Sequence, residues 1–278
     1  MLQLASDIRE RAAGKKIAIM GVGTFCTLNM RFLIELGLDI CFFVDVDYCN
    51  RRYFEYQTGF KVKPYEALNP REHFPFIYQN NYLVVDSIEN QLQKNGFQKQ
   101  DYLALPEVAN RDLWYRGMKI GKGASSYDVL MDWHTYVKEI GRYPSINHTA
   151  QVVFDHNKAN LTTVNLRYSP APSRERITIG HDVWMGANVV INASKAHHIG
   201  NGAIIGTGAV VIEDVPPYAV VAGVPGKVKK YRFVPHEIEI LQRLQWWNWD
   251  EAAMRENQDC FTNPKLLFER FKDRLAVK

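Results

Sequence analysis

The chain of 278 residues carries a formal net charge of +4, and 46% of its residues are hydrophobic while 23% are charged. So small a charge excludes a protein that coats nucleic acid, because such binding depends on dense neutralisation of phosphates. No apolar run approaches the roughly 20 residues of a membrane span, and the first residues lack the apolar stretch of a secretion signal. The four cysteines have no framework spacing and no CxxC metal motif occurs, which favours a reducing compartment. We therefore expect a soluble, cytoplasmic protein that binds neither nucleic acid nor membrane.

Alternating strands and helices are predicted for the first part of the chain. An aliphatic run at residues 16–20 ends at Gly21 and Gly23, and residues 29–38 then carry apolar side chains at helical spacing. A second buried strand is predicted at residues 39–44, and a later helix presents one apolar face made of Val84, Val85, Ile88 and Leu92. This alternation predicts a small doubly wound parallel sheet, and we assign residues 1–110 to this α/β domain.

A six-residue period governs the middle of the chain. Aliphatic residues recur at this spacing in three runs: Ile140, Ile146 and Val152; Ile179, Met185 and Ile191; Ile199, Ile205 and Val211. The period suits neither a helix nor a hairpin sheet, but it suits a coil of short parallel strands that each point one aliphatic side chain inward. Glycines follow several of these residues, and we expect them to supply positive φ at the corners of the coil: Gly141, Gly180, Gly186, Gly200 and Gly206. We assign residues 111–234 to this all-β domain.

Two segments depart from the period. Between Asn157 and Arg176 the residues Asn, Ser, Pro and Arg accumulate, which predicts a long loop, and such loops on a rigid scaffold often carry chemistry. From Pro235 onward the apolar spacing becomes helical, with stripes at Ile238, Leu241 and Leu244 and at Leu267, Phe268 and Phe271. We expect residues 235–278 to form helices that cap the open end of the coil, because an uncovered end exposes sheet edges.

Three motifs in the coil carry a resemblance to a known family. They are Ile179-Gly-His-Asp-Val-Trp-Met-Gly-Ala-Asn188, Ile199-Gly-Asn-Gly-Ala-Ile-Ile-Gly-Thr-Gly-Ala-Val-Val211, and Asp214-Val-Pro-Pro-Tyr-Ala-Val-Val-Ala-Gly-Val-Pro225. They closely resemble the hexapeptide-repeat acyltransferases, and Gln245-Trp-Trp-Asn-Trp-Asp250 is similar to the C-terminal region of the type B chloramphenicol and streptogramin acetyltransferases, also called xenobiotic acetyltransferases. The match covers roughly residues 140–263. The resemblance implies a left-handed parallel β-helix, acetyl-CoA as the acyl donor, and a homotrimer.

A separate resemblance concerns the first domain. Gly21-Val-Gly-Thr-Phe-Cys26 with Phe43-Val-Asp-Val-Asp47 is similar to the Rossmann-like domain of nucleotide-sugar acetyltransferases from bacterial glycan pathways, which favours glycan modification over drug resistance. Gly21, Gly23 and Asp45 also satisfy part of a dinucleotide fingerprint, with a tight turn for phosphate and a carboxylate for ribose, although Cys26 replaces the third glycine. We predict these three residues as substrate contacts. A domain that only packs and positions is the alternative.

The resemblance assigns the catalytic role to His156 in Val153-Phe-Asp-His-Asn157, just before the long loop, with Asp155 and Asn157 beside the acceptor. An unactivated hydroxyl is a poor nucleophile toward a thioester, and an imidazole that titrates near neutrality can take its proton. A polar loop histidine without a role is the alternative. The family usually has Asn in place of Asp155 and a Ser-Thr-x-Pro-Phe-like stretch in place of residues 161–166. No cysteine lies in the coil, so direct transfer replaces an acyl-enzyme route.

Acetyl-CoA is predicted to bind along the later turns of the coil. The resemblance implies donor contacts at Trp184, Gly206, Thr207, Gly208, Ala209, Gly223 and Pro225. Because CoA carries a pyrophosphate and a 3′-phosphate, its site needs cations near the mouth, and Lys227, Lys229 and Lys230 follow the last turn. A solvated basic surface is the alternative for these lysines, and packing at a subunit boundary is the alternative for Trp184.

These observations together predict an acetyl-CoA-dependent acetyltransferase that acts on a hydroxyl or amine of a sugar, as a nucleotide sugar or a polysaccharide precursor. An antibiotic hydroxyl is the nearest alternative acceptor. His181, His197 and His198 could in principle bind zinc as in the hexapeptide-repeat carbonic anhydrases, but corner histidines at the surface are the simpler interpretation and we expect no metal. A trimeric scaffold without catalysis is the remaining alternative.

Overall fold

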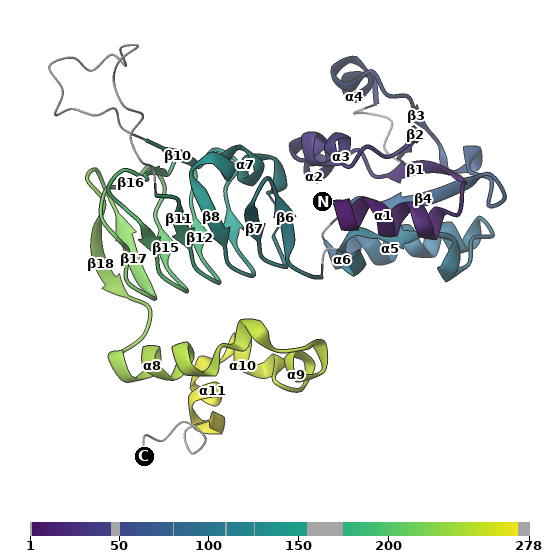
Figure 1. The fold of residues 1–278 in the computed structure, drawn as a ribbon. Helices are drawn as coiled ribbons and strands as arrows, with labels where there is room; N and C mark the ends of the chain where they lie inside the picture. Colours follow the sequence, from purple (N-terminus) through teal and green to yellow (C-terminus); the bar gives the residue numbers. More distant parts are fainter. Residues whose placement is uncertain are drawn as a thin grey trace, which may run out of the picture. The chain divides into compact units, whose positions relative to one another are not determined.

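The computed structural model describes residues 2–45, 51–79, 81–108, 110–124, 126–154 and 175–271. The chain separates into two compact units, Met1–His134 and Thr135–Lys278, and Figure 1 shows the elements of both. In the described part of the chain, no helix combines the length and the apolar character that a bilayer crossing requires. The predicted boundary between residues 110 and 111 stays a prediction.

The first unit contains a parallel sheet with helices around it. Its helices are α1 (Leu2–Ala12), α2 (Thr24–Leu28), α3 (Met30–Glu35), α4 (Arg51–Thr58), α5 (Tyr82–Lys94), α6 (Leu105–Val108) and α7 (Tyr127–Asp132), with short 3₁₀ turns η2 (Tyr65–Ala67), η3 (Lys99–Asp101) and η4 (Trp133–Thr135). Its strands are β1 (Lys16–Met20), β2 (Ile40–Val44), β3 (Val62–Lys63), β4 (His73–Ile77) and β5 (Leu103–Ala104), followed by the antiparallel hairpin of β6 (Leu113–Tyr115) and β7 (Met118–Ile120).

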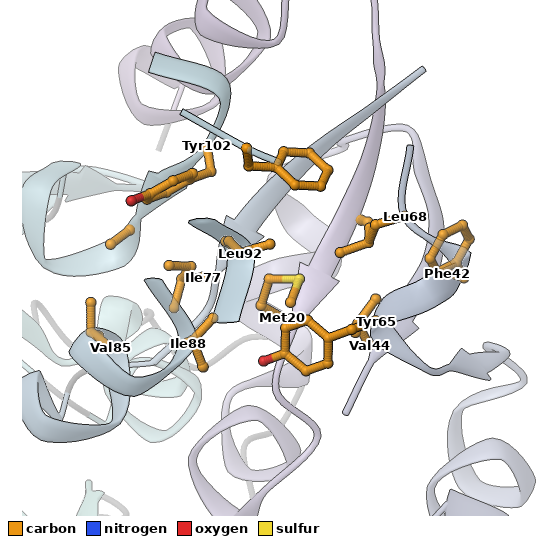
Figure 2. Packing of buried hydrophobic residues seen from close by; sticks show 13 residues of the cluster. Met20, Phe42, Val44, Tyr65, Leu68, Ile77, Val85, Ile88, Leu92 and Tyr102 are labelled. Carbon is orange, nitrogen blue, oxygen red and sulfur yellow. The ribbon is translucent and has the colours of Figure 1, made fainter. Parts of the chain in front are cut away.

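The parallel sheet has the strand order β3-β2-β1-β4-β5. Because the order runs outward from β1 in both directions, it is the arrangement of a doubly wound sheet. Buried side chains of α5 pack against Met20 and Ile77 on one face of the sheet (Figure 2), as the helical spacing predicts. One residue departs from that prediction, since Val84 is 38% exposed. The spacing of Val85, Ile88 and Leu92 already defines the inward stripe, and Val84 lies beside it.

The second unit consists of short strands followed by helices. The strands are β8 (Val137–Ile140), β9 (Ser145–Ile146), β10 (Gln151–Val153), β11 (Ile177–Ile179), β12 (Trp184–Met185), β13 (Val190–Asn192), β14 (His198–Ile199), β15 (Ile204–Ile205), β16 (Val210–Val211), β17 (Ala219–Ala222) and β18 (Lys227–Tyr231). The helical elements are α8 (Pro235–Leu244), η5 (Trp246–Asn248), α9 (Glu251–Glu256), α10 (Gln258–Thr262) and α11 (Pro264–Phe271).

Successive strands of the second unit join three parallel sheets in turn. We call them face 1 (β8, β11, β14), face 2 (β9, β12, β15, β17 and the antiparallel β18) and face 3 (β10, β13, β16). Corner 1 joins face 1 to face 2, corner 2 joins face 2 to face 3, and corner 3 joins face 3 back to face 1. The nine aliphatic residues predicted from the six-residue period point inward and are at most 5% exposed. Residues one turn apart are in direct register, as in Ile179↔Ile199 and Met185↔Ile205.

The corner glycines serve a different purpose from the one predicted. None of the five has positive φ, and that conformation belongs to the residue two positions later in each case: Tyr143, Asp182, Asn188, Gly202 and Gly208. At Gly141, Gly180, Gly186 and Gly200, glycine is favoured because the next turn of the coil passes very close, whereas at Gly206 the nearest atom would be 3.3 Å away. A Cβ on Gly141 would lie 2.5 Å from backbone atoms of Gly180 and His181, and one on Gly180 would lie 2.5 Å from the Asn201 side chain. The expectation of positive φ at these glycines was therefore wrong.

The C-terminal helices lie along corner 1 and not over the end of the coil, which corrects the sequence-based expectation. They contact corner residues of successive turns, namely Arg142, His181 and Asn201, and they enclose Tyr218 of the following turn in an apolar cluster. The edge that we expected them to cover is that of β17, and β18 already pairs with it. The apolar stripes of α8 and α11 are instead buried around Tyr218, with Leu241, Leu267 and Phe271 in the cluster.

Candidate functional site

The described residues nearest to the predicted catalytic segment, Phe154 and Arg176, lie at corner 3. Asp155, His156 and Asn157 lie outside the described residues, so their predicted roles stay predictions. The described residues on both sides of this segment are anchored at one place. The ring of Phe154 packs 5.2 Å from that of Tyr136, and the Arg176 guanidinium donates to the Val137 carbonyl at 3.0 Å. Phe154 and Arg176 therefore both lie where face 3 meets face 1.

Face 2 carries an apolar column on its outer surface. Each inward residue of this sheet follows an outward one, and the register aligns Trp184 with Ile204 and Ile204 with Val220. Trp184 is 42% exposed and the two aliphatic residues are partly exposed. Because neighbouring strands lie about 4.8 Å apart, the column offers a continuous apolar strip of roughly 10 Å. We call these three residues the face 2 column.

The three predicted lysines differ in their surroundings. Lys230 pairs with Val220 across β18 and β17, so it continues the face 2 column by one strand. Lys227 donates to Glu213 at 2.6 Å, so its charge is already balanced. Lys229 lies where the register of the two strands shifts. Lys230 is therefore the lysine best placed to meet an anionic group at the end of the apolar strip.

The other predicted donor contacts lie at corner 2 or just beyond it. Gly206, Thr207 and Gly208 follow β15, and Gly208 has a φ of +71°. The Thr207 hydroxyl lies close to Gly186 of the preceding turn, where a Cβ would approach it to 2.6 Å. The Ala209 side chain is fully buried, so it faces the core. Gly223 has a φ of +96°, and Pro225 follows it with a cis peptide bond, so the backbone reverses here toward β18.

The Gly21 turn in the first unit is held by Asp45. Gly21 has a φ of +97°, and the Val22 N–H donates to the Asp45 carboxylate at 2.7 Å. Tyr65 lies near the same carboxylate, and burial together with the Asp45 charge raises the pKa of Tyr65 to about 12. Gly23 precedes α2, a helix of only five residues. The structure thus brings together the three residues predicted as nucleotide contacts, but the carboxylate predicted for ribose binds the turn itself.

The coil histidines occupy two separate places. His197 lies at corner 3 and His198 begins β14 on face 1. The backbone N–H groups of both residues donate to the Asp214 carboxylate, and the His198 ring nitrogen Nδ1 lies 2.8 Å from the Thr178 hydroxyl. His181 lies at corner 1, where its Nδ1 accepts the Arg142 N–H at 2.9 Å. Among the described residues no group of three His, Cys, Asp or Glu side chains is arranged to hold a metal ion.

Sequence reasoning did not identify Ile204, Val220, Thr178 or Asp214. Ile204 and Val220 each precede an inward residue, as Trp184 does, so reading one position before the inward residue on every turn of face 2 would have found them. Thr178 and Asp214 carry no such signal, because they become neighbours of His198 only through the register of adjacent turns.

No known protein-family profile matches the chain. The chain is 45% identical over 80 residues to a chloramphenicol acetyltransferase from Klebsiella aerogenes, which covers 27% of this chain and 37% of that protein. It is 42% identical over 71 residues to the galactoside O-acetyltransferase of Escherichia coli strain K12, covering 23% and 34% of the two chains. The chain spans about half or less of the length of the curated relatives it matches. Among solved structures, WeeI from Acinetobacter baumannii AYE has a TM-score of 0.30 and 17% identity, over 77% of this chain and 99% of WeeI.

Proposed function

We propose that this protein is an acetyltransferase that transfers an acetyl group from acetyl-CoA directly to a hydroxyl or amine of a sugar. The observation that carries the proposal is the face 2 column followed by Lys230. The pantetheine arm of CoA is long and weakly polar, and its other end carries phosphates. An apolar strip that ends at a lysine with no ion pair among the described residues complements both parts of such a donor. The curated relatives quoted above are acetyltransferases.

His156 is proposed as the general base, and the coil geometry then implies a shared site. The nearest described residues on either side of His156, Phe154 and Arg176, lie at corner 3, between faces 3 and 1, whereas the donor column lies on face 2. In a three-sided coil that corner and that face lie on opposite sides of the core. We therefore propose that His156 of one copy acts on the donor held at face 2 of another copy. This supports a homotrimer built around a left-handed β-helix.

The outer surfaces of the three faces support the same assembly. Face 3 aligns Val190 with Val210, and face 2 carries its own apolar column. Face 1 is polar, with Glu139, Thr178 and His198 in register. Faces 2 and 3 therefore have the apolar character of contact surfaces, while face 1 suits solvent. In a closed ring of three copies, face 2 of each copy then packs near face 3 of the next, with corner 3 at the mouth of the cleft.

A mixing experiment tests the shared site. Two variants, His156→Ala and Trp184→Ala, should each lose most activity alone. When they are unfolded together and refolded as mixed trimers, about one interface in four combines an intact base with an intact donor face. Activity should then return to about a quarter of the wild-type value. No recovery, with trimers confirmed by light scattering, would place the base and the donor site within one chain.

A sugar acceptor is proposed partly from the similarity to a galactoside O-acetyltransferase. It is also proposed from the first unit. We propose that this unit is Rossmann-like and holds a nucleotide at Gly21, Gly23 and Asp45. A second candidate acceptor is an antibiotic hydroxyl, which the 45% identity to a chloramphenicol acetyltransferase favours. The test is CoA release with acetyl-CoA and a panel of nucleotide sugars, free sugars and chloramphenicol, followed by mass determination of products. Acetylated nucleotide sugar supports the first candidate. Acetylated chloramphenicol alone would replace it with the second.

A further inference from the structure

Corner 1 is built as a ladder of side chains that satisfy the backbone of the preceding turn. His181 Nδ1 accepts the backbone N–H of Arg142 at 2.9 Å, and the side-chain oxygen Oδ1 of Asn201 accepts the backbone N–H of His181 at 2.8 Å. The Asn201 amide then donates to Gln242 of α8 at 2.8 Å. The ladder therefore joins three turns of the coil to the C-terminal helices.

His181 also holds the segment η5 against the coil. Its ring stacks on the indole of Trp247 with centroids 4.8 Å apart and planes 6° from parallel. Trp247 is only 2% exposed. On either side of this stack, the Arg142 guanidinium donates to Asn248 at 2.9 Å, and Tyr143 stacks on Trp246 at 5.3 Å. His181 thus occupies the middle of the contact between corner 1 and η5.

The hydrogen bond to Arg142 fixes the protonation state of this imidazole. A ring nitrogen that accepts a backbone N–H carries no proton, so the proton of the neutral ring lies on Nε2. A protonated ring has N–H groups at both nitrogens, and Nδ1 would then face the Arg142 N–H as a second donor. We propose that His181 is a pH-sensitive latch that holds η5 on corner 1 when neutral and releases it when protonated.

Two cations and one carboxylate are described beside His181 on corner 1. Arg142 and Arg232 are cationic, while the carboxylate of Asp182 is engaged by Arg232 at 3.0 Å. Tyr143 and, on α8, Gln242 are uncharged. A cation stacked on a buried indole gains up to about 30-fold in the equilibrium constant. Losing the backbone hydrogen bond and opposing two donors costs about five- to 150-fold. The latch requires that this loss exceed the gain from stacking, which a pH titration tests directly.

The release is confined to η5. Leu241, Leu267 and Phe271 remain packed around Tyr218, and Trp246 of η5 also packs against this cluster. Burial raises the pKa of Tyr218, so this tyrosine stays protonated as the pH falls. Because one proton is taken up on release, the ratio of released to docked η5 changes at most about tenfold per pH unit. An ordinary histidine titrates near pH 6.5, so the test spans pH 5 to 8.

Tryptophan emission of the full chain between pH 5 and 8 tests the latch. We expect a red shift as the pH falls, because Trp247 leaves its buried position. His181→Asn keeps an acceptor for the Arg142 N–H, as Asn201 provides one for the His181 N–H, but it cannot titrate. This variant should show no shift, and so should His181→Gln.

His198→Asn is the matched control, since it removes a histidine from face 1 of the same coil and should keep the transition. A wild-type spectrum that does not change with pH would overturn the latch. So would a transition that persists in both His181 variants, or one that disappears in His198→Asn.

Discussion

Replacing Gly180 by alanine should strongly destabilise the coil. A Cβ at this position would lie 2.5 Å from the Asn201 side-chain oxygen, 2.7 Å from its backbone nitrogen and 2.9 Å from its Cα. Two of these are backbone atoms that cannot rotate away, and overpacking of this kind costs about 1–3 kcal/mol. Moving Asn201 also weakens its bond to the His181 N–H, worth about 1 kcal/mol. We expect a total loss of about 3 kcal/mol in the free energy of unfolding of the second unit.

Gly206→Ala is the matched control, because Gly206 occupies the same place after an inward isoleucine. Its nearest neighbour would be the Ala222 Cβ at 3.3 Å, so the loss should stay below about 1 kcal/mol. At about 3 °C per kcal/mol the two variants should differ in Tm by roughly 6 °C or more. Four of the six tryptophans lie in the second unit, so fluorescence reports its melting even if the units unfold separately. Equal Tm values for the two variants would refute the close-approach explanation of the corner glycines.

Three further predictions follow from the described contacts and the proposed site. Lys230→Ala should raise KM for acetyl-CoA about three- to tenfold and Lys227→Ala much less, since Glu213 already balances Lys227; equal effects in steady-state kinetics would contradict this distinction. His156→Ala should lower kcat by about 10² to 10⁴ with little change in KM for acetyl-CoA, whereas His198→Ala should retain activity; the reverse result would move the base to the coil. Burial raises the pKa of Asp182 despite its contact with Arg232, so this group favours folding at acid pH and opposes it as the pH rises through the raised pKa. Asp182→Asn should keep or raise Tm at pH 7 and flatten this dependence, whereas Arg232→Met, which leaves a carboxylate unpaired, should lower Tm.

The inward residues of the coil were predictable because each short strand contributes one of them. Ile140, Ile179 and Ile199 fall in register on face 1, so a period read along the chain gives the stacking of the turns without further information. The strands of the first unit were predictable for a related reason. Residues 16–20 and 39–44 form continuous aliphatic or aromatic runs that only a sheet buried on both faces accommodates.

The reason for the corner glycines could not be read from the sequence. Positive φ and close approach both favour glycine, and only the distance to the next turn separates them. Asp182 shows the difficulty, because it has a φ of +54° while Gly180, two positions earlier, does not have a positive φ. The position of the C-terminal helices was unpredictable for the same kind of reason. Their apolar stripes were visible, but the surface that receives them is created around Tyr218 by folding.

In the candidate site, too, the sequence predicted some features and only the structure could supply others. Trp184 was chosen from a resemblance, and the register supplies a physical reason for it, since Ile204 and Val220 extend its surface toward Lys230. The sequence alone could not rank the three lysines. Their distinction depends on β18 running antiparallel to β17 and on Glu213 reaching Lys227. The role of His156 stays a prediction from the resemblance.

The residue type of His181 did not by itself determine its role. From the sequence, a corner residue at the surface was the simpler interpretation of His181, with a metal ligand or a base on the coil as alternatives. Its neutral ring accepts an N–H from a residue 39 positions earlier through Nδ1, so its proton lies on Nε2 and neither nitrogen of the docked neutral ring has an unoccupied lone pair for a substrate proton. A base on the coil would therefore have to be a histidine held differently. His198 is the candidate, because a ring that donated from Nδ1 to the Thr178 hydroxyl would leave its Nε2 lone pair available.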